Sequence, residues 1–310
     1  MHKSTSMIDW ESRIVSGQSI IHPPIFPDEA ASALEVFKQL RIVDAVGQPT
    51  MGEACAQWVF DFVGAIFGAY DSDSGKRLIS EFMMLIPKKN SKSTIAAGIM
   101  LTALIRNWRQ SAEMIIVSPT VEIALNSYAP CRDMVKADPD LMDLFQVQDH
   151  LKCITHRRTG STLKVVAADQ HSLGGKKASW LLVDELHLLG KMNGASGMLL
   201  EASGGLAARP EGAIIYLTTQ SDDCPAGVFR EKLLYARGVR DGRIDDPGFM
   251  SVIYEFPDHM IQSGDHRNPD NFHIVNPNMG VSISKDFLNR EFRRKIHKKR
   301  IVSRNQLNCR

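Results

Sequence analysis

The sequence lacks the features that mark secreted, membrane-spanning and zinc-stabilised proteins. Residues 1–11 hold no apolar stretch of the kind found in a signal peptide, and no window approaches the roughly 20 apolar residues that span a bilayer. The five cysteines are scattered, odd in number and never paired as CxxC, which disfavours disulfides and a structural zinc. We therefore expect a reducing, cytoplasmic setting.

An excess of charge of one sign is also lacking. The formal net charge is +2, so any contact with nucleic acid must come from local basic patches. Hydrophobic residues make up 44% and charged residues 23%, as in ordinary globular proteins. With 310 residues, the chain can bury a substantial core as one large domain or two modest ones.

The chain divides into three parts by the pattern of its residues. Residues 1–26 are polar and contain a Pro-Pro step, which predicts an extended N-terminal arm. Residues 27–242 begin with helical patterns over 27–40 and 51–67, and short apolar runs then alternate with helices. This alternation predicts a mainly parallel sheet that helices cover on both faces. The predicted strands are 77–86, 114–117, 162–167, 180–183 and 213–217.

Residues 243–310 have a different character. The stretch from 246 to 278 is rich in Pro, Asp, Asn and His, with one strand pattern over 250–256. Ser284 is a candidate N-cap for a basic helical segment that runs to Arg304. We expect this part to be a linker.

The strongest local motif is LIPKKNSKST, residues 85–94, between a predicted strand and a predicted helix. This context is the one that a phosphate-binding P-loop requires, although Ile86 and Ser91 replace the two glycines of GxxxxGK[ST]. In a P-loop, Lys92 would reach the β- and γ-phosphates and Ser93 would ligate Mg²⁺, while backbone N–H groups hold phosphate oxygens. A solvated turn explains a lysine-rich loop equally well when the motif stands alone.

A second motif, WLLVDE, is an apolar strand that ends in the carboxylates Asp184 and Glu185. In a Walker B arrangement, Asp184 holds the water shell of Mg²⁺ and Glu185 polarises the attacking water. A helix N-cap with a first-turn acid also explains this pair, but it does not explain the lysine–serine loop after an earlier strand. Together, the motifs predict an α/β P-loop NTPase of the additional-strand type, with a short C-terminal linker.

A third polar group, Thr218-Thr219-Gln220, follows the predicted strand 213–217. Side chains at this strand tip could sense the γ-phosphate, and a simple strand-ending turn is the alternative.

In this order, the motifs resemble those of the large terminase subunits of tailed phages, over roughly residues 50–308. Gln57-Trp58, followed by Phe-Gly at 67–68, is similar to the adenine-recognition glutamine and its helix. PKKNSKS resembles the family's Walker A loop, with Ser91 in place of the usual Gly. LLVDELH resembles the Walker B strand of the family, and LTTQ resembles its coupling motif. Residues 275–280 resemble its NP-x-x-G segment. The residues that the resemblance assigns to nucleotide binding are Gln57, Pro87, Lys88, Lys89, Asn90, Ser91, Lys92, Ser93 and Thr94.

The resemblance implies an ATPase that uses ATP and Mg²⁺ to drive double-stranded DNA into a procapsid. Lys92 and Glu185 would be catalytic, Ser93 and Asp184 would hold the metal, and 218–220 would couple hydrolysis to movement. The implied partners are a portal protein, a small terminase subunit and identical subunits in a ring, in the cytoplasm of the bacterial host. The family's nuclease domain should begin about where this sequence ends, so we expect no nuclease activity. We interpret the chain as a fragment or as the product of a truncated phage or prophage gene.

Two other functions fit the motifs. Asp184-Glu185-Leu186-His187 also satisfies a DExH helicase box, but a helicase needs a second RecA-like domain and too few residues follow the motor for one. A decayed prophage remnant that binds nucleotide or a capsid partner without turnover would fit Ser91 and the missing nuclease.

Several basic residues outside the motifs are weaker candidates. Lys176 and Lys177, which precede the acidic strand, could act in trans on a neighbouring site, without the bidentate fork of arginine. The loop 156–158 could contact DNA or a neighbouring subunit. The basic run 293–300 could grip phosphates, and we interpret it as a solvated helix face.

Three further residues have structural interpretations. We expect His187 to make an ordinary hydrogen bond in a helix, and Trp108 and Phe145 to lie in the core.

Overall fold

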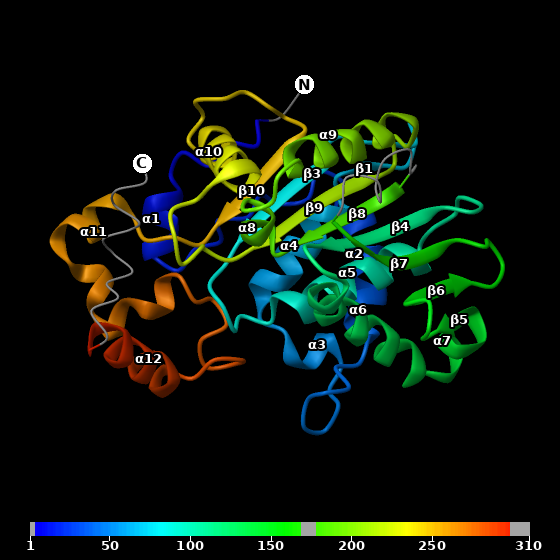
Figure 1. Ribbon diagram of the computed structural model, residues 1–310, viewed down its shortest axis with the longest axis horizontal. Helices are drawn as coiled ribbons and strands as arrows, with labels where there is room; N and C mark the ends of the chain where they lie inside the picture. Colours follow the sequence, from blue (N-terminus) through cyan, green and yellow to red (C-terminus); the bar gives the residue numbers. More distant parts are fainter. Residues whose placement is uncertain (1–3, 169–177, 298–310) are drawn as a thin grey trace.

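A large, mainly parallel sheet organises the protein, whose computed structural model describes residues 4–168 and 178–297. Among these residues, eight strands pair in the order β10-β3-β9-β8-β4-β7-β6-β5 (Figure 1). All neighbours from β10 to β7 are parallel, whereas β6 is antiparallel to both β5 and β7. The strands are β3 Glu81–Leu85, β4 Glu113–Ser118, β5 Phe145–Gln148, β6 Cys153–His156, β7 Thr162–Ala167, β8 Ala178–Asp184, β9 Ala213–Thr218 and β10 Phe249–Ile253.

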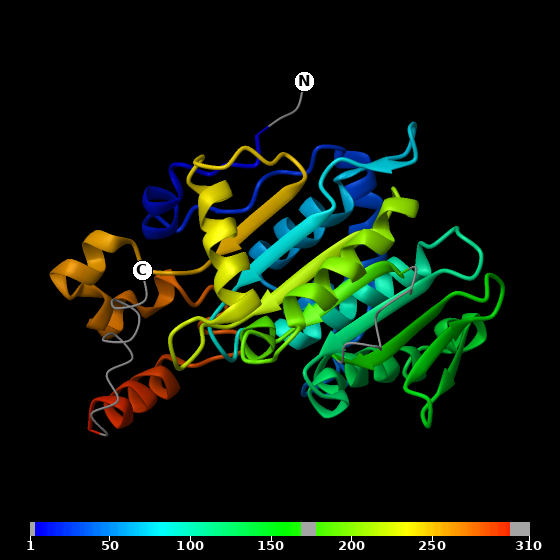
Figure 2. The same cartoon turned by 45° about the horizontal axis from the view of Figure 1, so that its top comes forward.

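Helices cover both faces of this sheet (Figure 2). One face packs against α2 (Pro27–Gln39), α4 (Gln57–Phe67), α5 (Lys92–Ile105) and α6 (Val121–Lys136). The other packs against α8 (Leu186–Leu189), α9 (Ala195–Gly205) and α10 (Gly227–Arg240). The remaining elements are α1 Trp10–Val15, α3 Met51–Ala54, β1 Tyr70–Asp71, β2 Lys76–Arg77, α7 Pro139–Leu144, η1 Leu206–Ala208, α11 Asp258–Ser263, η2 Asp265–Arg267, η3 Pro269–Ile274 and α12 Lys285–His297.

The central strands are apolar throughout because both of their faces are buried. In β3, Phe82 and Met84 belong to the core beneath α5, whereas Met83 and Leu85 belong to the core beneath α10. This alternation is the two-residue period of an extended strand. The predicted α/β fold with a mainly parallel, helix-flanked sheet is confirmed. Strand β9 lies between β3 and β8, so one additional strand separates the strands that carry the first two motifs.

Several elements differ from the sequence prediction. The arm that was predicted to be extended contains α1, whose Trp10 and Ile14 are buried, and the Met7 N–H donates to the carbonyl of Arg240. The helix predicted over 51–67 is interrupted between α3 and α4, where Cys55 has extended backbone. The strand pattern predicted over 250–256 is confirmed as β10, but this strand joins the main sheet beside β3. Ser284 accepts a hydrogen bond from the N–H of Phe287, so its predicted role as an N-cap is confirmed.

The cysteines depart from the prediction at one position. Cys55, Cys131 and Cys153 are free thiols, but Cys224 is disulfide-bonded, against the expectation that the chain forms no disulfide. No helix within 4–168 or 178–297 has both the length and the apolar character needed to cross a membrane.

Candidate functional site

The three polar motifs meet at one edge of the sheet. Parallel strands place their carboxyl ends together, and ligands of open α/β sheets bind outside those ends. Leu85, the last residue of β3, pairs with Thr218 of β9, and Asp184 at the end of β8 pairs with Leu217. The loop after β3, the carboxylates after β8 and the threonines after β9 therefore face the same space.

The loop after β3 enters α5 through left-handed backbone at two residues that are not glycine. Lys89 has φ 74°, and Ser91 has φ 58° and ψ 23° as the N-cap of α5. Side chains other than glycine lose about 1 to 2 kcal/mol in this conformation. Ser91 occupies the position of the second P-loop glycine, so the departure in sequence coincides with a backbone geometry that glycine would adopt without penalty.

The side chain of Lys92 lies between the two carboxylates at the end of β8. Its Nζ is 2.6 Å from Oδ1 of Asp184 and 2.9 Å from Oε1 of Glu185, and only 8% of the side chain is exposed. Burial alone lowers the pKa of the Lys92 ammonium, but the two carboxylates outweigh it and raise this pKa above its ordinary value. The lysine of the loop and the acids of the strand thus form one buried ionic group.

Asp184 is held from several directions. Its Oδ2 accepts a 2.6 Å hydrogen bond from Ser127 Oγ of α6, and its Oδ1 accepts one from the N–H of Glu185. Its backbone carbonyl accepts a further bond from Ser118 at the end of β4. A fully buried carboxylate requires such partners. Ser127 was not predicted from the sequence, because its contact with Asp184 arises only when α6 packs beside the end of β8.

Glu185 is connected to the end of β9 through His187. His187 Nδ1 lies 3.2 Å from Oε2 of Glu185 and 3.3 Å from Oγ1 of Thr218, whose hydroxyl also accepts a bond from the His187 N–H. Burial favours the neutral acid, but His187 and Lys92 outweigh it and lower the pKa of Glu185 to about 2. The expected ordinary hydrogen bond of His187 is present, since its N–H donates to Thr218, and its ring also lies beside the Glu185 carboxylate.

Gln57 lies outside this ionic group. Its side chain is exposed at the start of α4, where Nε2 donates to Asp61. The neighbouring Trp58 Nε1 donates to Oδ1 of Asn278, and Asn278 in turn contacts the loop after β3 through its backbone N–H and Asn90. The adenine-recognition role of Gln57 stays a prediction.

The other predicted loop residues lie around Lys92. Pro87 accepts a hydrogen bond from Asn90, and Lys88 is in an exposed ion pair with Asp222. Ser93 and Thr94 are half-buried in the first turn of α5. Thr219 and Gln220 follow Thr218, and Oγ1 of Thr219 is a buried atom that has no hydrogen-bond partner within the described part of the chain.

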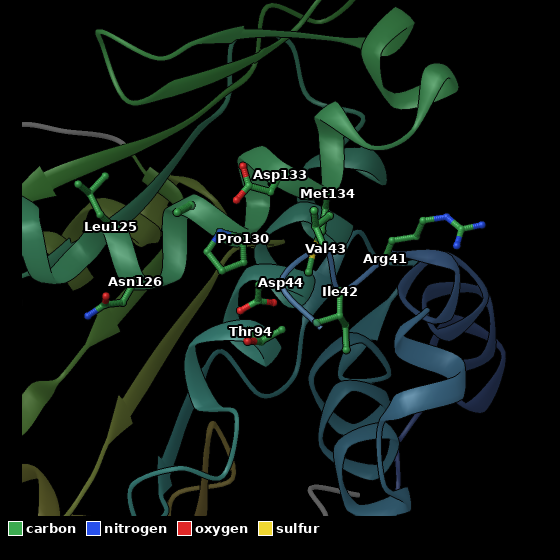
Figure 3. A pocket seen from close by; sticks show the side chains of 11 residues that line it. Arg41, Ile42, Val43, Asp44, Thr94, Leu125, Asn126, Pro130, Asp133 and Met134 are labelled. Carbon is green, nitrogen blue, oxygen red and sulfur yellow. The ribbon is translucent and has the colours of Figure 1, made fainter. Parts of the chain in front are cut away.

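A cavity of about 230 Å³ opens beside Thr94, on the α6 side of α5 (Figure 3). Its walls come from the turn after α2, the first turn of α5 and the middle of α6. Asp44 and Asp133 are charged residues of this wall, but neither Lys92 nor the acids of β8 line the cavity. It is therefore adjacent to the ionic group and separate from it.

Comparison of the amino-acid sequence with models of protein families shows which family the chain belongs to. A family model described as the ATPase domain of the terminase large subunit matches residues 57–237, more than half of the chain. The chain belongs to this terminase family. The matched residues include the loop after β3, the acids of β8 and the threonines of β9.

One solved terminase structure shares the fold. The bacteriophage HK97 large terminase superimposes with a TM-score of 0.69 at 17% identity, and the match covers 86% of this chain and 52% of that one. The chain therefore spans about half the length of the HK97 protein. The large terminase ATPase domain of Thermus phage P74-26 matches over 67% of this chain and 87% of that one, at 15% identity and a TM-score of 0.46. No curated protein sequence matches significantly.

Two predictions about single residues of this terminase chain have clear outcomes. Phe145 is fully buried, as expected. Trp108 is 61% exposed, so its assignment to the core is wrong. It lies just beyond the end of α5, where Arg109 stacks on its ring at 5.1 Å.

The weaker basic candidates of the terminase chain have mixed outcomes. His156 is buried against Phe145, while Arg157 and Arg158 are exposed in the turn before β7. Arg293 and Arg294 lie on an exposed face of α12, as expected for a solvated helix. The side chains from residue 295 onward, and all of Lys176 and Lys177, lie outside the described residues.

Proposed function

We propose that this chain is the ATP-hydrolysing motor of a tailed-phage large terminase, which drives double-stranded DNA into a procapsid. Membership of the family and the position of β9 between β3 and β8 support this function. The observation that carries it is the Lys92 ammonium between the carboxylates of Asp184 and Glu185. A buried group of one cation and two acids, at the edge where ligands of such sheets bind, is suited to a polyphosphate substrate.

Lys92 would exchange partners when ATP binds. Its ammonium would leave the two carboxylates and contact the β- and γ-phosphate oxygens, while the backbone N–H groups at the start of α5 hold the phosphates. Once Lys92 has moved, Glu185 would be available to accept a hydrogen bond from the attacking water. His187 and Thr218 would fix the direction in which this carboxylate points.

The residues present fit Mg²⁺. Within the described residues, no cluster of three or more His, Cys, Asp or Glu side chains could hold a metal alone, so phosphate oxygens would have to complete its shell. Mg²⁺ characteristically combines one or two protein oxygens with substrate phosphates, and Ser93 and Asp184 would supply the protein oxygens. When bound, the ion neutralises charge that develops on the phosphates. The unpartnered Thr219 hydroxyl could accept or donate a bond at the same edge.

The proposed function also implies partners. A packaging motor acts on double-stranded DNA, docks on a portal protein as a ring of identical subunits and receives DNA from a small terminase subunit. Such a motor works in the cytoplasm of the bacterial host. Gln57 would contact the adenine base, and the residues 218–220 would couple hydrolysis to DNA movement.

ATPase assays with double-stranded DNA test this function. We expect Mg²⁺-dependent hydrolysis that DNA or a packaging partner stimulates and that disappears in Lys92→Ala and Glu185→Gln. Lys136→Ala and Glu201→Gln, which change the same residue types at exposed positions, should keep the activity. Failure of the wild-type chain to bind Mg-ATP in calorimetry would contradict the proposal, and strand separation of a duplex would favour a helicase.

A further inference from the structure

The segment from Asn276 to Ser282 contacts the phosphate-binding loop from a distant part of the sequence. The side chain of Asn90 is completely buried, and Asn276 lies 186 residues further along the chain. Asn90 Nδ2 donates to the carbonyl of Pro87 at 3.0 Å and to Oδ1 of Asn276 at 3.1 Å. Its Oδ1 accepts a 3.0 Å bond from the N–H of Asn278. Asn90 therefore ties the loop both to itself and to this segment.

A second attachment lies one residue earlier in the loop. Ser282 Oγ donates a 2.7 Å hydrogen bond to the carbonyl of Lys89, and it accepts a bond from Asn278 Nδ2. Figure 1 shows the segment, in orange, running beside the cyan loop that joins β3 to α5. The contacts thus hold both the side chain of Asn90 and the backbone of Lys89.

The segment is itself anchored to rigid elements. Asn276 Nδ2 donates to the carbonyl of Phe272 in η3, at 2.8 Å. Asn278 Oδ1 accepts a 2.9 Å bond from Trp58 Nε1, next to the predicted adenine-contacting Gln57. Asn276 and Asn278 are both buried. A segment that is anchored at Asn276 and Asn278 can impose its shape on the loop.

We propose that Asn276, Asn278 and Ser282, here called the loop clasp, are positioning residues that hold the phosphate-binding loop in its binding conformation. The inference rests on the proposed function, because it assigns the clasp to the ATP site. Lys89 and Ser91 flank Asn90 and have left-handed backbone without being glycine. Such strained residues persist only where their surroundings determine their conformation, and the clasp supplies those constraints on the Lys89 side.

If the loop clasp holds the phosphate-binding loop, substitutions in the clasp should weaken ATP binding while the protein still folds. Ser282 is exposed and contributes only its hydroxyl to the loop, so Ser282→Ala should leave the melting temperature unchanged. Losing the bond to Lys89, together with the one that the hydroxyl accepts from Asn278, should raise the Kd for Mg-ATP about fivefold, with kcat within about twofold of wild type. Asn276→Ala should raise the Kd about tenfold, because it leaves buried Asn90 with an unpaired donor. Ser282→Thr keeps the hydroxyl and should restore wild-type affinity.

Asn271→Ala is the matched control. Asn271 lies in the same part of the chain and also donates to a backbone carbonyl, that of Asp265, without touching the loop. Calorimetry with Mg-ATP on all variants separates the possible results. If the wild type binds Mg-ATP and both Asn276→Ala and Ser282→Ala bind it with the same affinity, the clasp proposal is wrong. An equal loss of affinity in the control Asn271→Ala would also overturn it. Absence of binding in the wild type would instead contradict the proposed function.

Discussion

Ser91 has a backbone conformation that is sterically unfavourable for a residue with a side chain. With φ 58° it lies in the left-handed region, at the entrance to α5. Replacing it with glycine removes the steric penalty, and we expect Ser91→Gly to increase the free energy of unfolding by about 1 kcal/mol. Denaturant unfolding measures this change, and the affinity for Mg-ATP should rise in the same variant because the loop is less strained.

Ser111→Gly separates these two effects. Ser111 also has a left-handed backbone, with φ 52°, but it lies in the turn before β4, and its N–H bonds to Thr159. The substitution should stabilise the protein by a similar amount and leave nucleotide affinity unchanged. Equal gains in affinity for both variants would show that the strain at Ser91 has no specific connection with binding.

In the proposed mechanism, His187 would set the direction of the Glu185 carboxylate. It contacts Glu185 and Thr218 while packing against Phe229 of α10. Because small misplacements of a catalytic group are costly, His187→Ala should lower kcat by about 10- to 100-fold and change the Kd for Mg-ATP little. Steady-state ATPase kinetics check this split. His150→Ala, at an exposed position, should have no effect, and unchanged kcat in His187→Ala would exclude the positioning role.

Single residues of the site were predictable only where they belong to a motif. Lys92, Asp184 and Glu185 carry chemistry that their spacing and their predicted elements made visible, and the structure brings their charges together. Ser127 and Asn276 could not be connected to the site, because their contacts arise when α6 and the segment after η3 pack against it. Sequence separation conceals such partners.

Among the elements, α5 depends on a close approach to α2. A Cβ added at Gly98 of α5 would lie 2.6 Å from Cε2 of Phe37. Overpacking costs about 1 to 3 kcal/mol and exceeds the gain of about 1 kcal/mol in helix propensity, so Gly98→Ala should lower the free energy of unfolding. Gly197→Ala in α9, where nothing lies within 4 Å of the new Cβ, should raise it instead. If the urea unfolding curves of Gly98→Ala and Gly197→Ala shift in the same direction relative to wild type, this account is wrong.

The helices and strands were predictable to different degrees. The strands β3, β4, β8 and β9 are apolar on both faces, so their runs stand out from the surrounding sequence. The antiparallel strands β6 and β5, of which β5 forms the edge of the sheet, are only four residues long and mix polar with apolar residues, which left no clear period. Helix α9 was missed because Ser and Gly dilute its apolar stripe.

At the scale of the whole molecule, a partly buried ionic cluster joins α10 to the end of β10. Glu255 is paired with Arg237 and Arg240, and Arg240 stacks on Trp10 of the N-terminal segment at 3.7 Å. Removing the charge of Glu255 leaves the two arginines without this carboxylate partner. Glu255→Gln should therefore lower the free energy of unfolding by about 2 kcal/mol at pH 7. Thermal denaturation measures this loss.

The contribution of Glu255 should also depend on pH. Burial favours the neutral acid, but Arg237 and Arg240 outweigh it and lower the pKa of Glu255 below its ordinary value of 4.5. A depressed pKa stabilises the folded state above the unfolded value, and this stabilisation is lost as the pH falls through the folded value. The stability difference between wild type and Glu255→Gln should therefore shrink below about pH 4.5. A constant difference down to pH 3 would contradict this assignment.

The overall architecture followed from the sequence because alternating apolar runs and helices leave few ways to cover both faces of a sheet. The packing of the N-terminal segment did not follow, since Trp10 and Ile14 gave too short a pattern to reveal a buried helix. Contacts between distant segments, such as Trp10 with Arg240, depend on the assembled fold.

The ionic group around Lys92 makes the site selective for the charge of what enters it. Before nucleotide binds, one ammonium offsets only one of the two carboxylate charges, so the group carries a net negative charge. A bare triphosphate that drew Lys92 away would expose both acids to its own negative oxygens, in a region of low dielectric where repulsion is strong. Positive charge therefore has to arrive together with the phosphates. The resting site would reject metal-free nucleotide and admit the nucleotide as its divalent-cation complex.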